Sequence, residues 1–174
     1  MEQVILVDKH DNETGVAEKM QAHREGLMHR AFSVFLFNNS GELLLQQRAF
    51  HKYHSGGLWT NTCCSHPRPN EETLEAAYRR LQEEMGIADC ELTKAFDFIY
   101  FAELDDDLKE NEFDHVFIGK WNGIPVVNAD EVADYKWIAP STLLADVEVN
   151  PKAYTFWFKE VIERVLNEVK SNSI

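Results

Sequence analysis

Residues 65–87 read SHPRPNEETLEAAYRRLQEEMGI, and this stretch says most about the fold. Asn70 is a suitable N-cap, Glu71 and Glu72 suit the first turn of a helix, and Gly86 is a natural C-terminal stop. A helix is therefore expected over residues 71–85. Apolar residues recur in it at helical spacing and predict one buried face, made of Leu74, Ala77, Tyr78, Leu81 and Met85.

The segments on either side of this helix are mostly typical of strands. Residues 31–37 and 43–45 are separated by turn-forming residues and predict a hairpin. Residues 11–15 are rich in turn formers and predict a turn. A last helix is expected to open at Asn150-Pro151. The other expected strands are residues 4–7, 58–64, 96–104, 112–121 and 135–138. Strands outnumber helices, which favours an α+β class with helices packed on a mixed sheet.

Length and composition are those of one globular domain. The 174 residues, 44% hydrophobic and 27% charged, predict a single domain over residues 1–174. No apolar run approaches the roughly 20 residues of a membrane span, and Glu2 stands where a signal peptide carries basic residues. Two of the three cysteines are adjacent, which is unlike a secreted disulfide scaffold. We therefore expect reduced thiols, a cytoplasmic location and no membrane partner.

The charge is acidic and unevenly distributed. A net charge of -13 disfavours nucleic acid as a partner, because a phosphate backbone attracts basic surfaces. Residues 1–80 carry nine basic and ten acidic side chains, whereas residues 81–174 carry eight and twenty. An anionic ligand should therefore be held from the N-terminal half of the chain. The sequence does not predict an oligomeric state.

The stretch 65–87 resembles the Nudix box, a metal-binding motif that ends in a glutamate-rich helix. The matching residues are Glu71, Arg79, Leu81, Glu83, Glu84, Gly86 and Ile87. Two positions differ, since Ser65 replaces a glycine and Arg80 replaces a glutamate that helps Nudix hydrolases hold their metal ions. A guanidinium weakens Mg²⁺ binding and adds a phosphate ligand, so the motif disfavours hydrolysis.

The wider pattern is similar to that of type I isopentenyl-diphosphate isomerases, which use the Nudix fold for a different reaction. Residues 59–67 (WTNTCCSHP) carry much of this resemblance. It extends over nearly the whole chain, through Glu18-Lys19, Ala22-His23 and residues 110–112 to Trp157. The resemblance implies a Nudix-like mixed β-sheet sandwiched by helices. It also implies the interconversion of isopentenyl and dimethylallyl diphosphate for isoprenoid biosynthesis.

The resemblance also assigns roles to particular residues. The catalytic group would be Cys64, Glu112, Tyr100 and Trp157, and the substrate diphosphate would be bound by Lys19, Arg48, Lys52 and Arg80. A tightly bound divalent metal, Mn²⁺, Zn²⁺ or Mg²⁺, would be held by His23, His29, His66, Glu110 and Glu112. A further Mg²⁺ would arrive with the diphosphate and bind Glu84.

Elementary chemistry agrees with these assignments. Moving a double bond along a carbon chain requires a proton to be added at one carbon and removed from another, with a tertiary carbocation between the two steps. A thiol and a carboxyl on separate strands can flank a flat alkene, and a tryptophan face attracts a desolvated cation by about 2 kcal/mol. Glu110 and Glu112 are two residues apart on a predicted strand, so their side chains point to the same face. Together with imidazoles they suit Mn²⁺, Zn²⁺ or Fe²⁺ better than Ca²⁺.

Each of these residues also has an ordinary structural explanation. A strand cysteine is usually a small core residue, an isolated histidine is usually hydrogen-bonded, and Arg79 and Arg80 have the spacing to pair with Glu83 and Glu84. Their occurrence in the order and spacing of one family argues against that explanation. No role is expected for His10, His51, His54, His115, Cys63 and Cys90, which we take as structural.

Two other functions are compatible with parts of the sequence. One is a Nudix hydrolase that cleaves a nucleoside diphosphate derivative, which release of phosphate or nucleoside monophosphate would reveal. The other is a non-catalytic binding module stabilised by a histidine and glutamate metal site. That module would unfold on metal removal and would tolerate Cys64→Ala without functional change.

Overall fold

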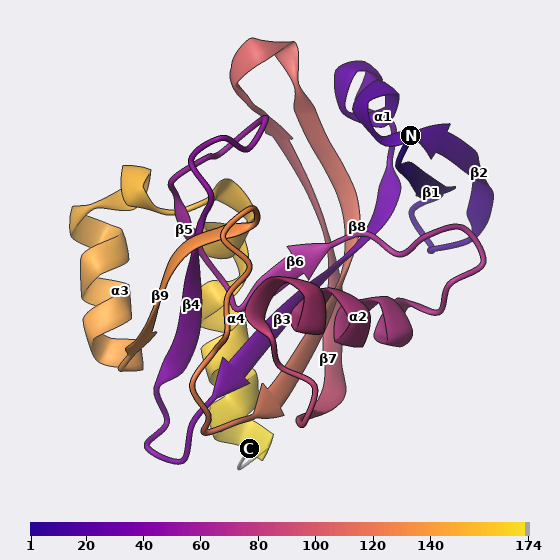
Figure 1. The fold of residues 1–174 in the computed structure, drawn as a ribbon. Coiled ribbons are helices and arrows are strands. Elements are labelled where there is room, and N and C mark those ends of the chain that lie inside the picture. Colours follow the sequence, from indigo (N-terminus) through magenta and orange to yellow (C-terminus); the bar gives the residue numbers. More distant parts are fainter. Residues whose placement is uncertain (173–174) are drawn as a thin grey trace.

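One mixed sheet of nine strands forms the frame of the computed structural model, which describes residues 1–172 apart from the side chain of Asp105 (Figure 1). The strands are β1 (Gln3–Val7), β2 (Glu13–Glu18), β3 (His29–Phe37), β4 (Leu43–Arg48), β5 (Trp59–Thr60), β6 (Cys63–Ser65), β7 (Glu91–Glu103), β8 (Lys109–Lys120) and β9 (Val132–Ile138). The helices are α1 (Lys19–Glu25), α2 (Thr73–Met85), α3 (Pro140–Val149) and α4 (Phe156–Asn172), with short 3-10 helices at Asp105–Asp107 and Pro151–Ala153.

Strand β3 lies between the two strands that carry the expected catalytic pair. Ser33 of β3 pairs with Cys64 of β6 on one side and with Val116 of β8 on the other. The β3–β8 pairing is parallel along the whole of β3, and it places His29 opposite Glu112. Strand β7 pairs with the outer edge of β8. Segments that are far apart in the sequence therefore meet at one end of β3.

Helices cover both faces of the sheet, as the sequence predicts. Phe35 and Phe37 pack in a core with α4, which contributes Phe158, Val161 and Ile162, among others. The alternate β3 residues Phe32, Val34 and Leu36 pack in a second core under α2, which contributes Ala76, Ala77, Leu81 and Met85. A strand that is buried on both faces needs a continuous apolar run, and residues 31–37 supply one.

The predicted hairpin of residues 31–37 and 43–45 forms only at its closed end. Phe37 pairs with Leu43, but β4 then leaves β3 and pairs with β9 and β5 instead. Since β6 and β8 occupy the two edges of β3, no edge remains for β4 beyond the turn. The hairpin prediction is thus correct for the turn and wrong for the pairing.

Helix α2 confirms the long helix with two local differences. It begins at Thr73, because Asn70 takes a left-handed conformation (φ 64°) and Glu71 is held by the backbone N–H of Arg68. Leu74, which was predicted for the buried face, lies in the first turn and is 40% exposed. The helix ends at Gly86 as predicted. There φ is 67°, and a Cβ would lie 2.6 Å from the carbonyl oxygen of Val126, so glycine is required.

The N-terminal segment contains two elements that the sequence analysis did not predict. The turn comes earlier than residues 11–15, because the Asp8 carboxylate accepts hydrogen bonds from the backbone of His10 and Asn12. Strand β2 follows it and pairs with β1. Glu18 then caps helix α1, because its carboxylate accepts two backbone N–H groups, and this short helix carries Lys19 and His23.

The predicted strand over residues 58–64 is two short strands joined by Asn61 and Thr62. The Asn61 amide donates to the carbonyl oxygens of Val34 and Cys63, and the Thr62 hydroxyl donates to that of Leu44. These buried side chains bind both β3 and β4, so the chain changes its partner from β4 to β3 at this point. The change brings Cys64 next to β3.

The C-terminal region has one more helix than predicted. Pro140 occupies the first turn of α3, whereas Pro151 opens only a 3-10 turn and α4 begins at Phe156. Both prolines obey the rule that proline favours a first helical turn. Among residues 1–172, no helix combines the length and apolar character needed to cross a membrane.

Candidate active site

A polar pocket opens where β3, β6 and β8 lie side by side. It is lined by residues from α1, the loop after β4, β6, α2, β7, β8 and α4. The predicted site residues in its wall are Lys19, Arg48, Lys52, Cys64, His66, Arg80, Glu84, Tyr100, Glu110, Glu112 and Trp157. The two remaining ones, His23 and His29, lie beside it in a cluster with His66 and Glu112. The fold therefore brings together every residue that the sequence analysis selected.

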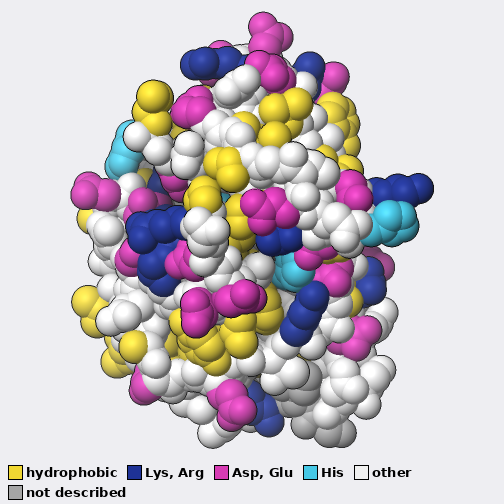
Figure 2. Space-filling model, turned by 90° about the vertical axis from the view of Figure 1, so that its right-hand side faces the viewer, with side chains coloured by type: hydrophobic (Ala, Val, Ile, Leu, Met, Phe, Trp, Pro, Cys, Tyr) yellow, Lys and Arg dark blue, Asp and Glu magenta, His cyan; other side chains and the backbone are white. Residues whose placement is uncertain are grey.

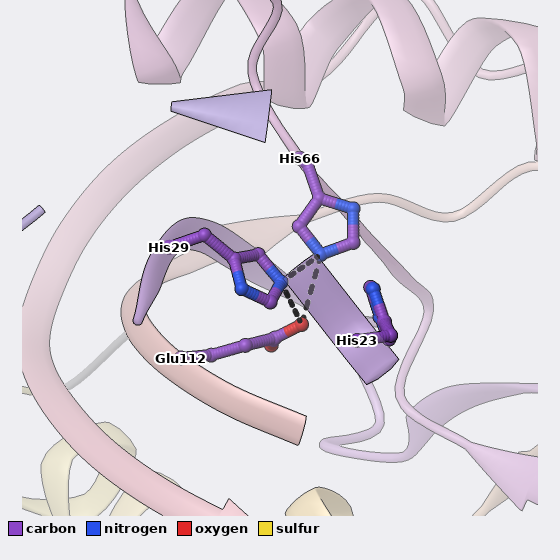
Figure 3. A group of neighbouring side chains, drawn as sticks. All are labelled: His23, His29, His66 and Glu112. Carbon is purple, nitrogen blue, oxygen red and sulfur yellow. Dashed lines mark hydrogen bonds and ion pairs between the residues drawn. The ribbon is translucent and has the colours of Figure 1, made fainter. Parts of the chain in front are cut away.

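Three imidazoles and one carboxylate form this cluster, and Figure 3 shows His29 and His66 in contact with Glu112 while His23 lies beside them. His66 Nε2 lies 2.8 Å and His29 Nε2 lies 3.4 Å from Glu112 Oε1, and the two nitrogens are 3.2 Å apart. His23 and His29 each donate Nδ1–H to a backbone carbonyl oxygen, those of Lys19 and Leu27, at 2.8 Å. In the neutral rings Nε2 therefore keeps its lone pair and faces the cluster.

These donors fit a divalent metal ion. The Nε2 atom of His23 is buried without a hydrogen-bond partner, which is costly unless a cation binds there. Metal bonds of about 2.0–2.2 Å place neighbouring donor atoms about 3.0–3.5 Å apart. The contacts of 3.2 and 3.4 Å lie in this range, and the contact of 2.8 Å between His66 and Glu112 is shorter. A set that mixes imidazole nitrogen with carboxylate oxygen suits Mn²⁺, Fe²⁺ or Zn²⁺.

The carboxylate of Glu110 lies with a histidine that was expected to be structural. His54 Nε2 is 3.0 Å and His23 Nε2 is 3.6 Å from Glu110 Oε1, and these three residues form a second group of possible ligands. His54, which was expected to be structural, therefore lies in the wall of the pocket. The signal available in the sequence was its position in the Gly-rich loop two residues after Lys52.

Cys64 and Cys63 point to opposite faces of β6. Cys63 lies in the core under α2, whereas Cys64 lines the pocket. This arrangement follows from strand alternation and agrees with the expectation that the two thiols differ. Burial raises the pKa of the Cys64 thiol to about 12, so the group is protonated at neutral pH.

Glu112 is ionised in the same pocket, although burial alone would raise its pKa. When His29 is protonated, its positive charge and hydrogen bond, together with the Tyr100 hydroxyl that donates to Oε2 at 2.6 Å, lower the pKa of Glu112 to about 2. A protonated thiol and an ionised carboxylate therefore line one pocket. They have the opposite protonation states that a proton donor and a proton acceptor require.

Asp114 is a pocket residue that the sequence analysis did not select. It follows Glu110 and Glu112 on the same face of β8, it is 1% exposed, and Ser33 donates a hydrogen bond to its Oδ2 at 2.8 Å. Burial raises the pKa of its carboxyl well above the usual range. The alternating pattern of residues 110–114 contained the signal, because every second residue of a strand shares a face.

The four predicted cations enter the pocket with different partners. Arg80 pairs with Glu84 at 2.6 Å and with Glu83 at 2.9 Å, and Lys52 pairs with Glu131. Lys19 pairs with the exposed Glu2. The guanidinium of Arg48 instead lies 5.4 Å from the ring centroid of Trp157, and its Nε is buried without a hydrogen-bond partner. Acidic and basic side chains intermix in this way over the face drawn in Figure 2.

Trp157 is fixed at the edge of the pocket by its indole N–H. The ring is 3% exposed, and Nε1 donates to the Asn61 amide oxygen at 3.3 Å. Its position at the start of α4 places an aromatic face close to Arg48 and His54. The ring excludes water from this side of the pocket and offers a π-face to a cation.

Known proteins share this fold. The NUDIX domain model matches residues 27–160. Among solved structures, that of DR0079 from Deinococcus radiodurans superimposes with a TM-score of 0.79, covering 94% of this chain and 98% of its own, at 20% identity. The MutT protein of Methanosarcina mazei Go1 superimposes with a TM-score of 0.65, covering 82% and 96% of the two chains, at 21% identity. These likenesses define the class of the chain, that of NUDIX-domain proteins.

Closer relatives identify the family within that class. Isopentenyl-diphosphate Delta-isomerase 2 of Aromatoleum aromaticum is 55% identical over 166 residues, covering 95% of this chain and 87% of the relative. Isopentenyl-diphosphate Delta-isomerase 1 of the same organism is 58% identical over 165 residues, covering 95% and 93%. The chain belongs to the isopentenyl-diphosphate Delta-isomerase family.

Proposed function

We infer that this protein is an isopentenyl-diphosphate Delta-isomerase, which converts isopentenyl diphosphate to dimethylallyl diphosphate for isoprenoid biosynthesis. The observation that carries this function is the identity of 55–58% to isomerases of that name over 95% of the chain. The pocket supports it, because it contains a protonated thiol, an ionised carboxylate and an aromatic face. We assign the activity to residues 1–174 acting as one domain.

The acid and base roles fall to Cys64 and Glu112. A proton must be added to the terminal carbon of the double bond and removed from the carbon two bonds away, with a tertiary carbocation between the steps. The two groups lie on strands that flank β3, so an alkene in the pocket is reached by both. Tyr100 holds Glu112 in place through its hydrogen bond, and Trp157 shields the cation from water.

Arg80 and Glu84 suit a diphosphate that arrives with Mg²⁺. In the free protein the two side chains neutralise each other, and Gln46 also donates to Glu84 at 2.9 Å. A Mg²⁺ diphosphate brings a cation for Glu84 and an anion for Arg80, so the internal pair is exchanged for two new ones. Lys19, Arg48 and Lys52 line the same pocket and complete the neutralisation of the diphosphate.

A divalent cation would be held by His23, His29, His66, Glu110 and Glu112. When bound, it supplies positive charge next to Glu112 and so favours the ionised form of that carboxylate. The chain itself provides imidazoles whose outer nitrogens are fixed by backbone carbonyls. Mn²⁺, Zn²⁺ and Mg²⁺ are the candidate ions, and the donor chemistry favours the first two.

A hydrolase function is disfavoured by the same residues. Arg80 occupies the place of a metal-binding glutamate, and its guanidinium contacts Glu83, Glu84 and Glu131. A nucleotide panel assayed for released phosphate or nucleoside monophosphate tests this alternative. A cytoplasmic location stays a prediction, and the three free thiols are consistent with it.

The direct test of the function follows solvent hydrogen into the product. Purified protein, isopentenyl diphosphate and Mg²⁺ are incubated in D₂O, and deuterium in the allylic product is followed by NMR. We expect label in the methyl group that forms from the protonated carbon, because the Cys64 proton exchanges with solvent. An unlabelled product, or none at all, would contradict the proposed chemistry.

Metal removal should abolish turnover reversibly. Chelator-treated protein is expected to lose activity and to regain it when Mn²⁺ or Zn²⁺ is restored, because the buried imidazoles need a cation between them. His66→Ala should lower the bound metal measured by elemental analysis, and His10→Ala, on the exposed Asp8 turn, is the control. Active protein without a transition metal that also tolerates His66→Ala would contradict this site.

The Arg80 position should control substrate affinity. We expect Arg80→Gln to weaken binding of isopentenyl diphosphate by at least about tenfold, because a charge-assisted contact is lost. Arg80→Glu should weaken it further and should not create nucleotide hydrolysis. Isothermal titration measures both, with Arg68→Glu as an exposed control of the same charge change. Unchanged affinity in Arg80→Glu would refute the diphosphate role.

A further inference from the structure

His54 is a buried imidazole at the metal cluster for which neither the family resemblance nor the comparisons provide a role. It lies in the loop between β4 and β5, and its side chain is only 5% exposed. Its ring stacks with that of His23 at a centroid distance of 5.8 Å and meets Tyr53 edge-on at 4.4 Å. These contacts hold the ring between α1 and the pocket.

The atoms that His54 faces lack a proton to share. His23 donates Nδ1–H to the carbonyl oxygen of Lys19, so Nε2 of the neutral ring carries a lone pair, and that buried atom has no hydrogen-bond partner among the residues that the structure describes. Glu110 Oε1 lies 3.6 Å from it and is also an acceptor. His54 Nε2 lies 3.0 Å from the same oxygen, and the three donor atoms are within 4.8 Å of one another. A cation among them would satisfy all three.

We propose that His54 Nε2 is a further ligand of the divalent metal ion in this chain. The proposal rests on the metal site of the proposed function and adds a fourth imidazole to it. The two groups of donors share His23, and one nitrogen lone pair binds one ion, so both groups surround a single ion. The chain then offers six donor residues, namely His23, His29, His54, His66, Glu110 and Glu112.

Two consequences follow from a fourth imidazole. Borderline ions such as Zn²⁺, Fe²⁺ and Co²⁺ gain more from it than Mg²⁺, which prefers oxygen ligands. The loop that carries His54 also carries Lys52, a residue of the diphosphate site. Metal binding therefore fixes the loop that contacts the substrate.

The ligand count can be measured on the wild-type protein. Chelator-treated full-length chain is loaded with Mn²⁺, with and without ¹⁵N-labelled histidine, and bound imidazole nitrogens are counted by electron–nuclear double resonance. We expect one ion per chain with four bound imidazoles in the wild type and three in His54→Gln. A wild-type count of three with a normal stoichiometry would overturn the His54 assignment alone. Absence of tight metal binding would also overturn the proposed metal site.

Affinity measurements separate a ligand from a hydrogen-bond partner of Glu110. Glutamine keeps a donor for Glu110 but has no imidazole, so we expect both His54→Ala and His54→Gln to weaken Mn²⁺ binding by at least about 100-fold, beyond the usual effect of outer residues. His51→Ala, an exposed histidine of the same loop, is the matched control and should bind as the wild type does. Recovery of wild-type affinity in His54→Gln would show that His54 only positions Glu110.

Discussion

Cys64→Ala is expected to lower turnover by about 10²- to 10⁴-fold while the protein stays folded and binds substrate. The thiol lines the pocket, and burial holds its pKa at about 12, so it remains a proton donor throughout the neutral range. Alanine removes the donor without adding bulk. Steady-state kinetics with isopentenyl diphosphate and isothermal titration measure the loss of turnover and the retained affinity.

Cys63→Ala is the matched control for this variant. The two cysteines are neighbours on β6, but Cys63 faces the core under α2 and is fully buried there. Its removal should lower the free energy of unfolding by about 1 kcal/mol through a small cavity and leave turnover within about twofold. If Cys63→Ala abolished turnover and Cys64→Ala did not, the assignment of the acid and base would be wrong.

The pH dependence should follow from the same burial. A group with a raised pKa stays protonated until the pH approaches that value, so deprotonation of Cys64 should not limit turnover below about pH 10. The carboxylate of Glu112 has a lowered pKa and is ionised above about pH 4. Loss of turnover between about pH 8 and 9 that disappears in Cys64→Ser would contradict the high thiol pKa.

Residues that follow local rules were predictable from the sequence. Gly86 ends α2 because only a residue that tolerates positive φ fits beside the carbonyl of Val126. A glycine that follows a helical pattern predicts the end of the helix. The apolar run of β3 announces a strand that is buried on both sides. In both cases the physical constraint acts within a few residues, so the local sequence contains it.

Long-range pairing was not predictable in this way. The parallel register of β3 and β8 places His29 opposite Glu112, and β6 joins β3 because Asn61 and Thr62 bind the backbones of two strands. No short segment contains that information. The site residues were predicted from the family resemblance instead, because several separated motifs occur in one order along the chain.

His54 and Asp114 line the pocket although the sequence did not single them out for the site. His54 had an ordinary prior as a hydrogen-bonded histidine, and only the loop conformation brings it to Glu110. Asp114 stood two residues beyond Glu112, and strand alternation could have placed it in the pocket. What makes Asp114 notable is that its side chain is buried, and this burial depends on the strands that flank β8.

Three buried carboxylates in a row explain why the pocket needs cations. Glu110, Glu112 and Asp114 lie on one face of β8 and are at most 5% exposed. Like charges at this spacing raise one another's pKa unless positive charge lies nearby. The histidines face the first two. Among the described residues, the side chain of Asp114 is hydrogen-bonded to the Ser33 hydroxyl alone, and burial raises its pKa. The cluster therefore keeps Glu112 ionised next to a carboxyl whose raised pKa favours its neutral form.

Glu112→Gln should be at least as harmful as the loss of Cys64, with turnover lowered by about 10²- to 10⁴-fold or more. The carboxylate contacts His29, His66 and Tyr100, so one substitution removes both the proposed proton acceptor and a proposed metal donor. Glutamine preserves the size of the side chain and most of its packing. Turnover measured across a range of Mn²⁺ concentrations separates the two losses.

Glu110→Gln is the comparison that identifies the base, because Glu110 lies on the same face of β8 and is assigned to the proposed metal site without a role in proton removal. The substitution should weaken metal binding, and raising the Mn²⁺ concentration should restore much of the turnover. Glu112→Gln should bind metal at the same high concentration and remain inactive, since an amide does not accept the proton that must leave the carbocation. Equal rescue of both variants by Mn²⁺ would show that Glu112 acts only as a ligand. The proton acceptor would then be another buried carboxyl of the pocket, and Asp114, two residues further along β8, is the next candidate.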